Sequence, residues 1–218
     1  MEEYLDGPEY SVESISFDGD HIVVAITEKA CGPNFVEVGH AMPARLAAAD
    51  EAGISRCVTE LLDAVEFRHG PAHTEIKLTG DGPRVIESHG RTGGDRIRDL
   101  VEAAYGLDME RQAIGWAGGV LTALTEPPPL LRAAATRFLA AEPGRVIAVD
   151  GVADVRNQTG VFDVDMSITV GDTVRPLRAS WDRVGQILLT AASTTEAVAL
   201  SEGLAGRISV TTEQERPA

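Results

Sequence analysis

The chain has 218 residues, of which 44% are hydrophobic and 24% charged, a composition typical of a folded globular protein rather than a disordered one. Its net charge of −15 repels phosphate backbones and anionic lipid, which excludes nucleic acids and membrane surfaces as expected partners. No apolar run is long enough to span a membrane, and the acidic start does not resemble a signal peptide. The two cysteines, Cys31 and Cys57, lack metal-ligand spacing, so we expect reduced thiols in a cytoplasmic protein.

The first part of the chain predicts two hairpins and three helices. Strands are expected where β-branched residues alternate with polar ones, and helices where apolar residues recur every three or four positions. In chain order these are strands at 9–17 and 21–28, a short strand at 35–38, a helix at 52–68, strands at 73–79 and 84–89, and helices at 95–105 and 108–116. One interpretation of the loop before the helix at 95–105 is an ordinary loop in which Asp95 is the N-cap.

The run Pro127 to Pro129 marks the clearest break in the sequence, and the good helix formers of 130–141 predict a helix after it. The remaining segments then read strand, helix, strand, strand, helix, strand, which is the order of a ferredoxin-like βαββαβ unit. We therefore expect an α+β protein with two domains, 1–126 and 127–218.

The hairpin 73–89 carries the most informative residues. With its turn centred on Asp81, Glu75 lies opposite Glu87 and Lys77 opposite Val85. Glu75, Lys77, Glu87 and His89 are then expected on one face, and Ile76, Leu78 and Ile86 on the core face.

Two carboxylates directly across a strand pair repel each other, and a divalent cation would compensate for that repulsion. The alternative is an ordinary solvated face that Lys77 neutralises.

The loop after this hairpin has the composition of an anion site. Arg91 offers a rigid fork that matches phosphate or carboxylate, and Gly93 and Gly94 let the backbone approach a ligand before a helix N-terminus. The hairpin and the loop together therefore indicate a metal site next to an anion site.

The string HTEIKLTGDGPRVIESHGRTGGDRI, His73 to Ile97, resembles the ATP-grasp superfamily, whose pattern is a Glu on one strand, Glu-x-Asn-x-Arg on the next and then a glycine loop. The resemblance implies that Glu75 and Glu87 bind Mg²⁺ (or Mn²⁺) and that Arg91 contacts the transferred phosphate or acyl-phosphate. His89 stands where the family commonly has Asn, so we expect it to contact ATP rather than the metal.

Two further stretches resemble the same family. EEYLDGPEYSVE is similar to its hinge strand, which implies that Glu2, Glu3 and Leu5 line the adenine site and that Glu9 holds the ribose. The segment from Thr27 through FVEVGHAMPAR looks like amino-acid ligases of the superfamily. This likeness assigns Lys29 to the phosphates and His40 to the substrate pocket, the alternatives being a surface lysine at a strand end and a loop histidine with a backbone partner. Gly93 and Gly94 of the glycine loop are expected at the substrate.

The resemblance implies a carboxy-terminal ATP-grasp lobe, an antiparallel sheet with helices, followed by the small ferredoxin-like unit. The chain starts at the hinge, so we expect either a truncated reading frame or half of a split enzyme whose amino-terminal lobe comes from another chain. Apolar surface left by that lobe would favour a homo-oligomer.

The implied activity is ligation of a carboxylate, expected to be an amino acid, to an amine through an acyl-phosphate, with ATP and Mg²⁺. The alternatives are an orphaned nucleotide-binding half without catalysis and a biotin-carboxylase-like activity.

Overall fold

The computed structural model describes residues 3–32 and 35–213, which group into two compact units. The first consists of residues 3–29 and 42–132, and the second of 30–32, 35–41 and 133–213. The domain division expected after residue 126 stays a prediction. Among the described residues, no helix combines the length and the apolar character needed to cross a membrane.

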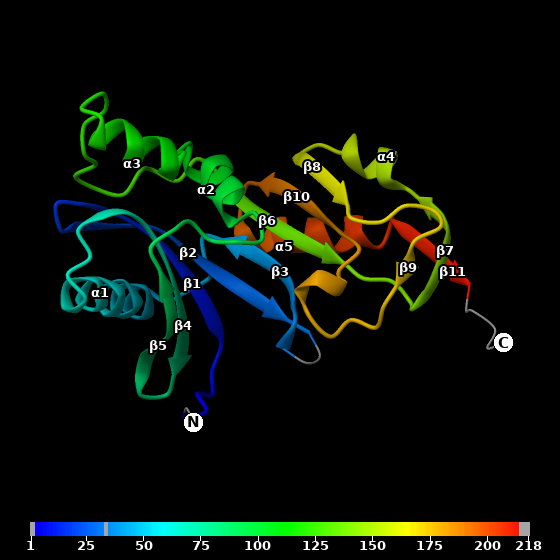
Figure 1. Cartoon of the computed structure of the whole chain (residues 1–218), viewed down its shortest axis with the longest axis horizontal. Helices are drawn as coiled ribbons and strands as arrows, with labels where there is room; N and C mark the ends of the chain where they lie inside the picture. The colour runs from blue at the N-terminus through cyan, green and yellow to red at the C-terminus, as the bar shows by residue number, and fades with distance from the viewer. Residues whose placement is uncertain (1–2, 33–34, 214–218) are drawn as a thin grey trace. The chain divides into compact units, whose positions relative to one another are not determined.

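The first unit is built on four antiparallel strands in the order β5-β4-β1-β2 (Figure 1). They are β1 (Glu9–Phe17), β2 (Asp20–Cys31), β4 (His69–Thr79) and β5 (Gly82–His89). Both predicted hairpins are therefore confirmed. In the first hairpin, the tight turn at Asp18 and Gly19 uses the left-handed backbone that the sequence indicates.

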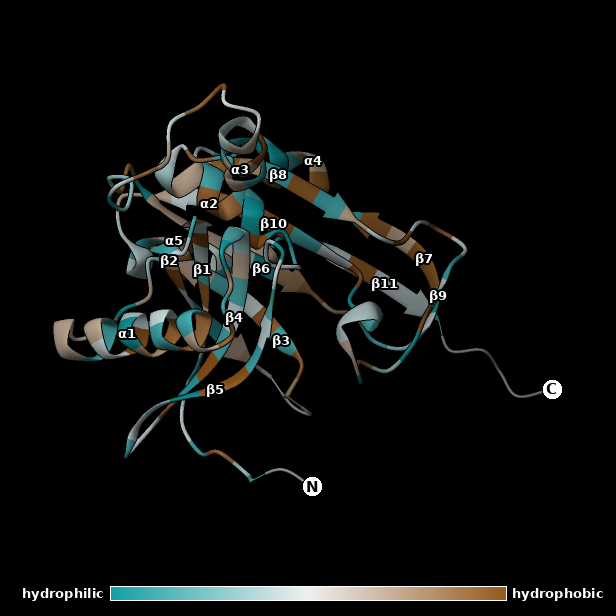
Figure 2. Ribbon diagram, turned by 60° about the vertical axis from the view of Figure 1, so that its left-hand side comes forward, coloured by the Kyte–Doolittle hydropathy of each residue, from teal (hydrophilic) through white to brown (hydrophobic). Residues whose placement is uncertain are grey.

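Helix α1 (Ala48–Ala64) covers one face of this sheet and closes the core of the first unit. Its buried residues, Ile54, Val58 and Leu62, recur every four positions and pack against Val12 and Ile76 of the sheet. Figure 2 shows hydrophilic and hydrophobic residues alternating along this amphipathic helix. Two shorter helices follow, α2 (Ile97–Tyr105) and α3 (Met109–Ala117).

The second unit begins with a strand where we expected a helix. Strand β6 (Ala133–Leu139) lies between β3 (Glu37–Met42) and β10 (Gly185–Ala191). The helix predicted for 130–141 is therefore wrong. The preference of Ala for helices is worth less than about 1 kcal/mol per residue, and it is outweighed here by a full ladder of pairing and almost complete burial of the strand.

The remaining elements of the second unit follow the predicted order. They are β7 (Gly144–Asp150), α4 (Val152–Arg156), β8 (Val161–Met166), β9 (Thr173–Val174), a 3₁₀ turn at Ser180–Asp182, β10, α5 (Thr194–Ala205) and β11 (Ser209–Glu213). The strands do not form one ferredoxin-like sheet. Strands β8 and β10 continue from β6, whereas β11, β7 and β9 form a separate sheet. Strand β6 takes the edge of β10 that β7 would occupy in a ferredoxin-like sheet, which accounts for the separation.

Candidate functional site

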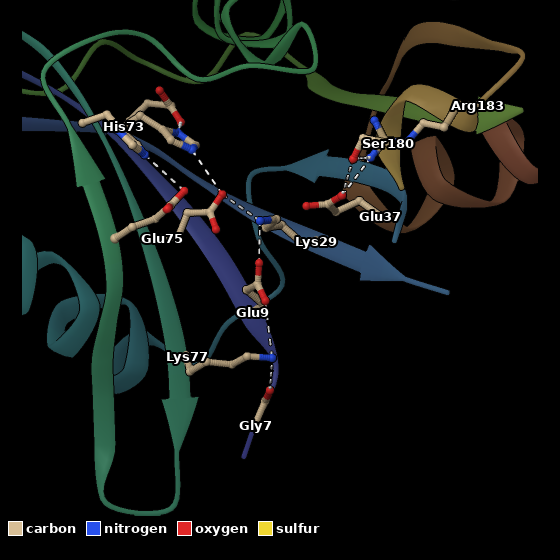
Figure 3. Close-up of polar contacts among 12 residues, drawn as sticks. Gly7, Glu9, Lys29, Glu37, His73, Glu75, Lys77, Ser180 and Arg183 are labelled. Atoms are coloured by element: carbon tan, nitrogen blue, oxygen red, sulfur yellow. Dashed lines mark hydrogen bonds and ion pairs between the residues drawn. The ribbon is translucent and has the colours of Figure 1, made fainter. Parts of the chain in front are cut away.

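Charged side chains line one face of the first unit's sheet. Glu9 and Glu13 of β1 pair with Lys77 and His73 of β4, and residues directly opposite each other in an antiparallel pair point to the same face. Glu75 lies between His73 and Lys77 with period 2 and therefore shares this face. Figure 3 shows the resulting cluster.

Lys29, from β2, is the centre of the cluster. Its Nζ lies 2.5 Å from Glu9 Oε1 and 2.9 Å from Glu75 Oε1, and its side chain is only 2% exposed. Lys77 reaches Glu9 from the other side, with Nζ 3.4 Å from Oε2. Glu75 is therefore neutralised by Lys29, whereas the expected neutralisation by Lys77 falls on Glu9.

A second ion pair lies beside the first. His73 Nδ1 is 2.5 Å from Glu13 Oε1, and its Nε2 is 3.4 Å from Glu75 Oε1. The Glu13 side chain is 1% exposed, and its other oxygen accepts a hydrogen bond of 3.1 Å from the backbone N–H of Gly93. The carboxylate of Glu13 thus joins the sheet to the glycine loop.

These contacts fix the charges of the cluster. Burial disfavours the charged form of Lys29, but hydrogen bonds to Glu75 and Glu9 outweigh it and raise the pKa of the ammonium. Burial opposes the imidazolium of His73 in the same way, yet the hydrogen bonds to Glu13 and Glu75 raise its pKa to about 9. The hydrogen bond from His73, against the effect of burial and with help from Lys29, lowers the pKa of Glu75 to about 2. At neutral pH Glu75 is a carboxylate between two cations.

Strands β4 and β5 place Glu75 directly opposite Glu87, as the sequence predicts. The register shifts by one residue immediately after this pair, so that Ile76 pairs with Val85 and Lys77 pairs with Arg84. The predicted pairing of Lys77 with Val85 is therefore wrong. The shift is a β-bulge, and it leaves Ile86 44% exposed instead of in the core.

The carboxylates of Glu75 and Glu87 have the chemistry of a magnesium site. Both contacts of Glu75 within the described part of the chain fall on Oε1, so Oε2 accepts no hydrogen bond there. Glu87 is 52% exposed, and its Oε1 lies 3.2 Å from His89 Nε2. Two carboxylate oxygens from neighbouring strands leave the rest of the shell to nucleotide phosphates and water, which is how Mg²⁺ is commonly held beside a nucleotide. The described residues contain no group of three or more His, Cys, Asp or Glu that could hold a metal by themselves.

The loop after β5 presents Arg91 at the surface, where its Nη1 donates a 2.8 Å hydrogen bond to the carbonyl of Thr92. Asp95 does not cap the next helix, because the residue before α2 is Arg96 and no side chain caps it. Gly93 and Gly94 differ in their surroundings. A Cβ on Gly93 would lie 2.9 Å from both Glu13 and His73, whereas a Cβ on Gly94 would have no atom within 4 Å.

The predicted nucleotide residues at the amino end are placed in part. Glu2 lies outside the described residues, Glu3 is exposed and Leu5 is half-buried ahead of β1. Glu9, expected at a ribose, forms ion pairs with Lys29 and Lys77.

His40 belongs to the second unit, on β3. It is buried at 2% exposure, and its ring meets Phe138 edge-on with centroids 5.2 Å apart. Burial and the edge-on contact with Phe138 hold the imidazole of His40 in one orientation.

A cavity of about 630 Å³ in the first unit has none of the predicted site residues among the described residues that line it. It runs along the start of β2 and is lined by Glu51, Tyr105 and Pro127, among others. We place the candidate site on the charged face of the sheet rather than in this cavity, because that face has carboxylates and cations that can bind a metal or a phosphate.

Sequence reasoning missed Glu13 and His73 as members of the site. After its first residue, Glu9, strand β1 is apolar and hydroxyl-bearing except for Glu13, and His73 precedes Glu75 by the two residues that put both on one face. These two spacings are the signals that could have identified them.

Family models match both parts of the chain. Residues 1–99 match the ATP-grasp domain, and residues 137–213 match the L-amino acid ligase C-terminal domain 2. The first range contains the cluster around Lys29, the Glu75 and Glu87 pair and the glycine loop.

Similar proteins point the same way. The chain is 32% identical to carnosine synthase 1 of Gallus gallus over 148 residues, which cover 66% of this chain and 16% of that protein. It is 30% identical to alanine–anticapsin ligase of Bacillus subtilis strain 168 over 100 residues, 45% of this chain and 21% of that protein. The crystal structure of an L-amino acid ligase from Bacillus licheniformis superposes with a TM-score of 0.85 and 25% identity, over 97% of this chain and 55% of that one.

The chain thus spans about half of the solved ligase and a smaller share of the two curated relatives. On these matches, the chain belongs to the ATP-grasp family, with a carboxy-terminal part of the L-amino acid ligase type.

Proposed function

We propose that this chain contributes the metal and phosphate site of an ATP-dependent ligase that joins the carboxylate of an amino acid to an amine. The observation that carries the proposal is the cross-strand pair of Glu75 and Glu87, which lies within the part that matches the ATP-grasp model. The names of the similar ligases support an amino acid as the substrate class.

In this proposal Glu75 and Glu87 hold Mg²⁺, or Mn²⁺ in its place. The metal, when bound, neutralises charge on the phosphates of ATP. Glu75 is suited to this task because it remains ionised at neutral pH and because its Oε2 is left open by its neighbours.

Arg91 is proposed to bind the transferred phosphoryl group. Its side chain is at the surface, two residues after β5 ends, and its guanidinium can form paired hydrogen bonds with phosphate oxygens. His89, 3.2 Å from Glu87, is proposed to donate a hydrogen bond to the nucleotide. Glu2, Glu3, Leu5, Glu9 and Lys29 are proposed to complete the nucleotide site.

Glu9 and Lys29 neutralise each other. In the proposed site Lys29 shares its ammonium between the carboxylates of Glu9 and Glu75 and a phosphate of ATP, since an ammonium has three N–H donors.

The reaction proposed has two steps. A carboxylate oxygen of the amino acid attacks the γ-phosphorus of ATP, the bond to ADP breaks, and an acyl-phosphate forms. The nitrogen of the amine then attacks the acyl carbon and loses a proton, phosphate leaves, and an amide is formed. Arg91 stabilises negative charge in both steps, and His40, Gly93 and Gly94 are proposed to contact the amino acid.

An isotope experiment tests this route. The chain is incubated with MgATP, an amine and an amino acid whose carboxylate carries ¹⁸O, and the products are read by mass spectrometry, so that slow turnover suffices. We expect ADP, an amide, and one ¹⁸O in the released phosphate. Formation of AMP and pyrophosphate would contradict the acyl-phosphate route. Binding of MgATP without turnover would favour a nucleotide-binding module instead.

A further inference from the structure

Glu13 is a buried carboxylate whose two oxygens serve two different segments of the first unit. Oε1 lies 2.5 Å from His73 Nδ1 on β4, and Oε2 accepts from the backbone N–H of Gly93 at 3.1 Å. We propose that Glu13 and His73 are positioning residues, which set the orientation of Glu75 and the place of the glycine loop. The inference rests on the proposed role of Glu75 as a metal ligand.

The link to Glu75 runs through the second nitrogen of His73. The Glu13 contact fixes the imidazole ring, which leaves Nε2 3.4 Å from Glu75 Oε1. Lys29 donates to the same oxygen at 2.9 Å. With Oε1 held by two donors, the carboxylate has one settled orientation, and Oε2 is the oxygen left for a metal.

The link to the loop is equally direct. Gly93 packs so closely on the pair that a Cβ would lie 2.9 Å from Glu13 Oε1 and 2.9 Å from His73 Nδ1. Only glycine fits without displacement of one of these groups, because Cβ contacts below 3.0 Å essentially never occur. The position of Gly93, and with it the start of the segment between Arg91 and α2, therefore depends on Glu13.

Stability alone does not account for this arrangement. The side chains of Glu13 and His73 are 1% and 5% exposed, so both are almost fully removed from water. Replacing a buried ion pair with apolar residues of similar volume is often neutral or stabilising. A buried pair that joins the proposed ligand to the loop is better explained by orientation, as is common for groups that hold metal ligands from behind.

The test compares three variants of the full chain. Glu13→Gln keeps the shape but has one oxygen and one NH₂ group, so it can accept from His73 or from Gly93 and not from both. His73→Gln removes the contact with Glu75 and leaves Glu13 free to hold Gly93. His21→Gln is the matched control. The side chain of His21 is also buried, at 4% exposure, and its Nδ1 lies 2.7 Å from Oγ of Ser16 on β1, the strand that carries Glu13.

Two properties are measured on each variant, MgATP affinity by calorimetry and hydrogen exchange of the Gly93 amide without nucleotide. We expect affinity for MgATP to fall about tenfold or more in Glu13→Gln and His73→Gln, and to stay unchanged in His21→Gln. The Gly93 amide should exchange faster in Glu13→Gln and at the wild-type rate in His73→Gln. If Glu13→Gln does not fold, His73→Gln still separates orientation of Glu75 from support of the loop.

The outcomes distinguish this inference from the proposed function. Wild-type affinity in both site variants, or an equal loss in His21→Gln, would overturn the positioning role and leave the metal site intact. A wild-type chain that does not bind MgATP would contradict the proposed function. In that case the positioning role of Glu13 is tested by hydrogen exchange alone, and an unchanged exchange rate of the Gly93 amide in Glu13→Gln would overturn it.

Discussion

The ammonium of Lys29 lies 2.9 Å from the Glu75 carboxylate inside the first unit, with the lysine side chain 2% exposed. The carboxylate that we assign to Mg²⁺ therefore already has an internal cation beside it. This pairing keeps Glu75 ionised and at the same time makes Lys29 a structural part of the site, so its removal is expected to affect both stability and binding.

Lys29→Met is expected to destabilise the chain by about 3–5 kcal/mol, because it removes the buried ammonium that Glu9 and Glu75 share. Urea denaturation followed by circular dichroism measures the change. The control is Lys77→Met, since Lys77 also contacts Glu9 but is 21% exposed, and we expect it to cost less than about 1 kcal/mol. Equal losses of stability in both variants would contradict the expectation that the buried Lys29 contributes more than the partly exposed Lys77.

The stability of the chain should fall as pH rises past neutrality, through His73. The pKa of His73 is raised in the folded chain, so its contribution is complete below the ordinary value of 6.5 and is lost as pH rises through about 9. The pKa of Glu75 is lowered in the folded chain, so its contribution to stability is present above pH 4.5 and is lost as pH falls through about 2.

The measurement is the free energy of unfolding against pH for the wild-type chain and for His73→Gln. Between pH 6.5 and about 9, the ordinary and the folded pKa of His73, we expect the free energy of unfolding to fall less in the variant than in the wild-type chain. Identical slopes in this range would mean that His73 does not bind its proton more tightly in the folded state.

Gly93→Ala is expected to destabilise the chain by about 1–3 kcal/mol, because the added Cβ would press on Glu13 and His73. Gly94→Ala is the neighbouring control and meets no atom within 4 Å, so thermal unfolding should leave it close to wild type. A Gly93 variant as stable as the Gly94 variant would contradict the close packing of the loop on the Glu13 and His73 pair.

The β-bulge predicts opposite sensitivities at two neighbouring isoleucines of the hairpin. Ile76 is fully buried, and truncation to Ala should cost about 2–5 kcal/mol. Ile86 is 44% exposed, and truncation to Ala should stay within about 0.5 kcal/mol. Chemical denaturation of the two variants decides the matter, since the register predicted from the sequence, with Ile86 on the core face, would make both substitutions costly.

Much of the first unit could be predicted from sequence because its hairpins have short turns with strong signals. Gly80 to Pro83 determine which strands pair. The register at the turn, Thr79 with Gly82, would by itself place Glu75 opposite Ile86, and the β-bulge brings Glu87 opposite Glu75 instead. The bulge at Ile86 could not be predicted, because alternation assumes one residue per position and Ile86 is as apolar as its buried neighbours.

The errors in the rest have physical causes. The alanines of β6 favour a helix locally, and only pairing with strands distant in the sequence makes them a strand. Glu13 was overlooked because a Glu in a strand ordinarily faces water, and its burial depends on His73, sixty residues away.

Calorimetric titration with ATP decides whether Glu75 and Glu87 form a metal and nucleotide site. The titration is made with and without Mg²⁺ on the wild-type chain, on Glu87→Gln, and on Glu60→Gln, whose side chain is 71% exposed on α1. We predict Mg²⁺-dependent binding that is lost in Glu87→Gln and retained in Glu60→Gln. Binding that does not need Mg²⁺, or that survives in Glu87→Gln, would contradict this assignment.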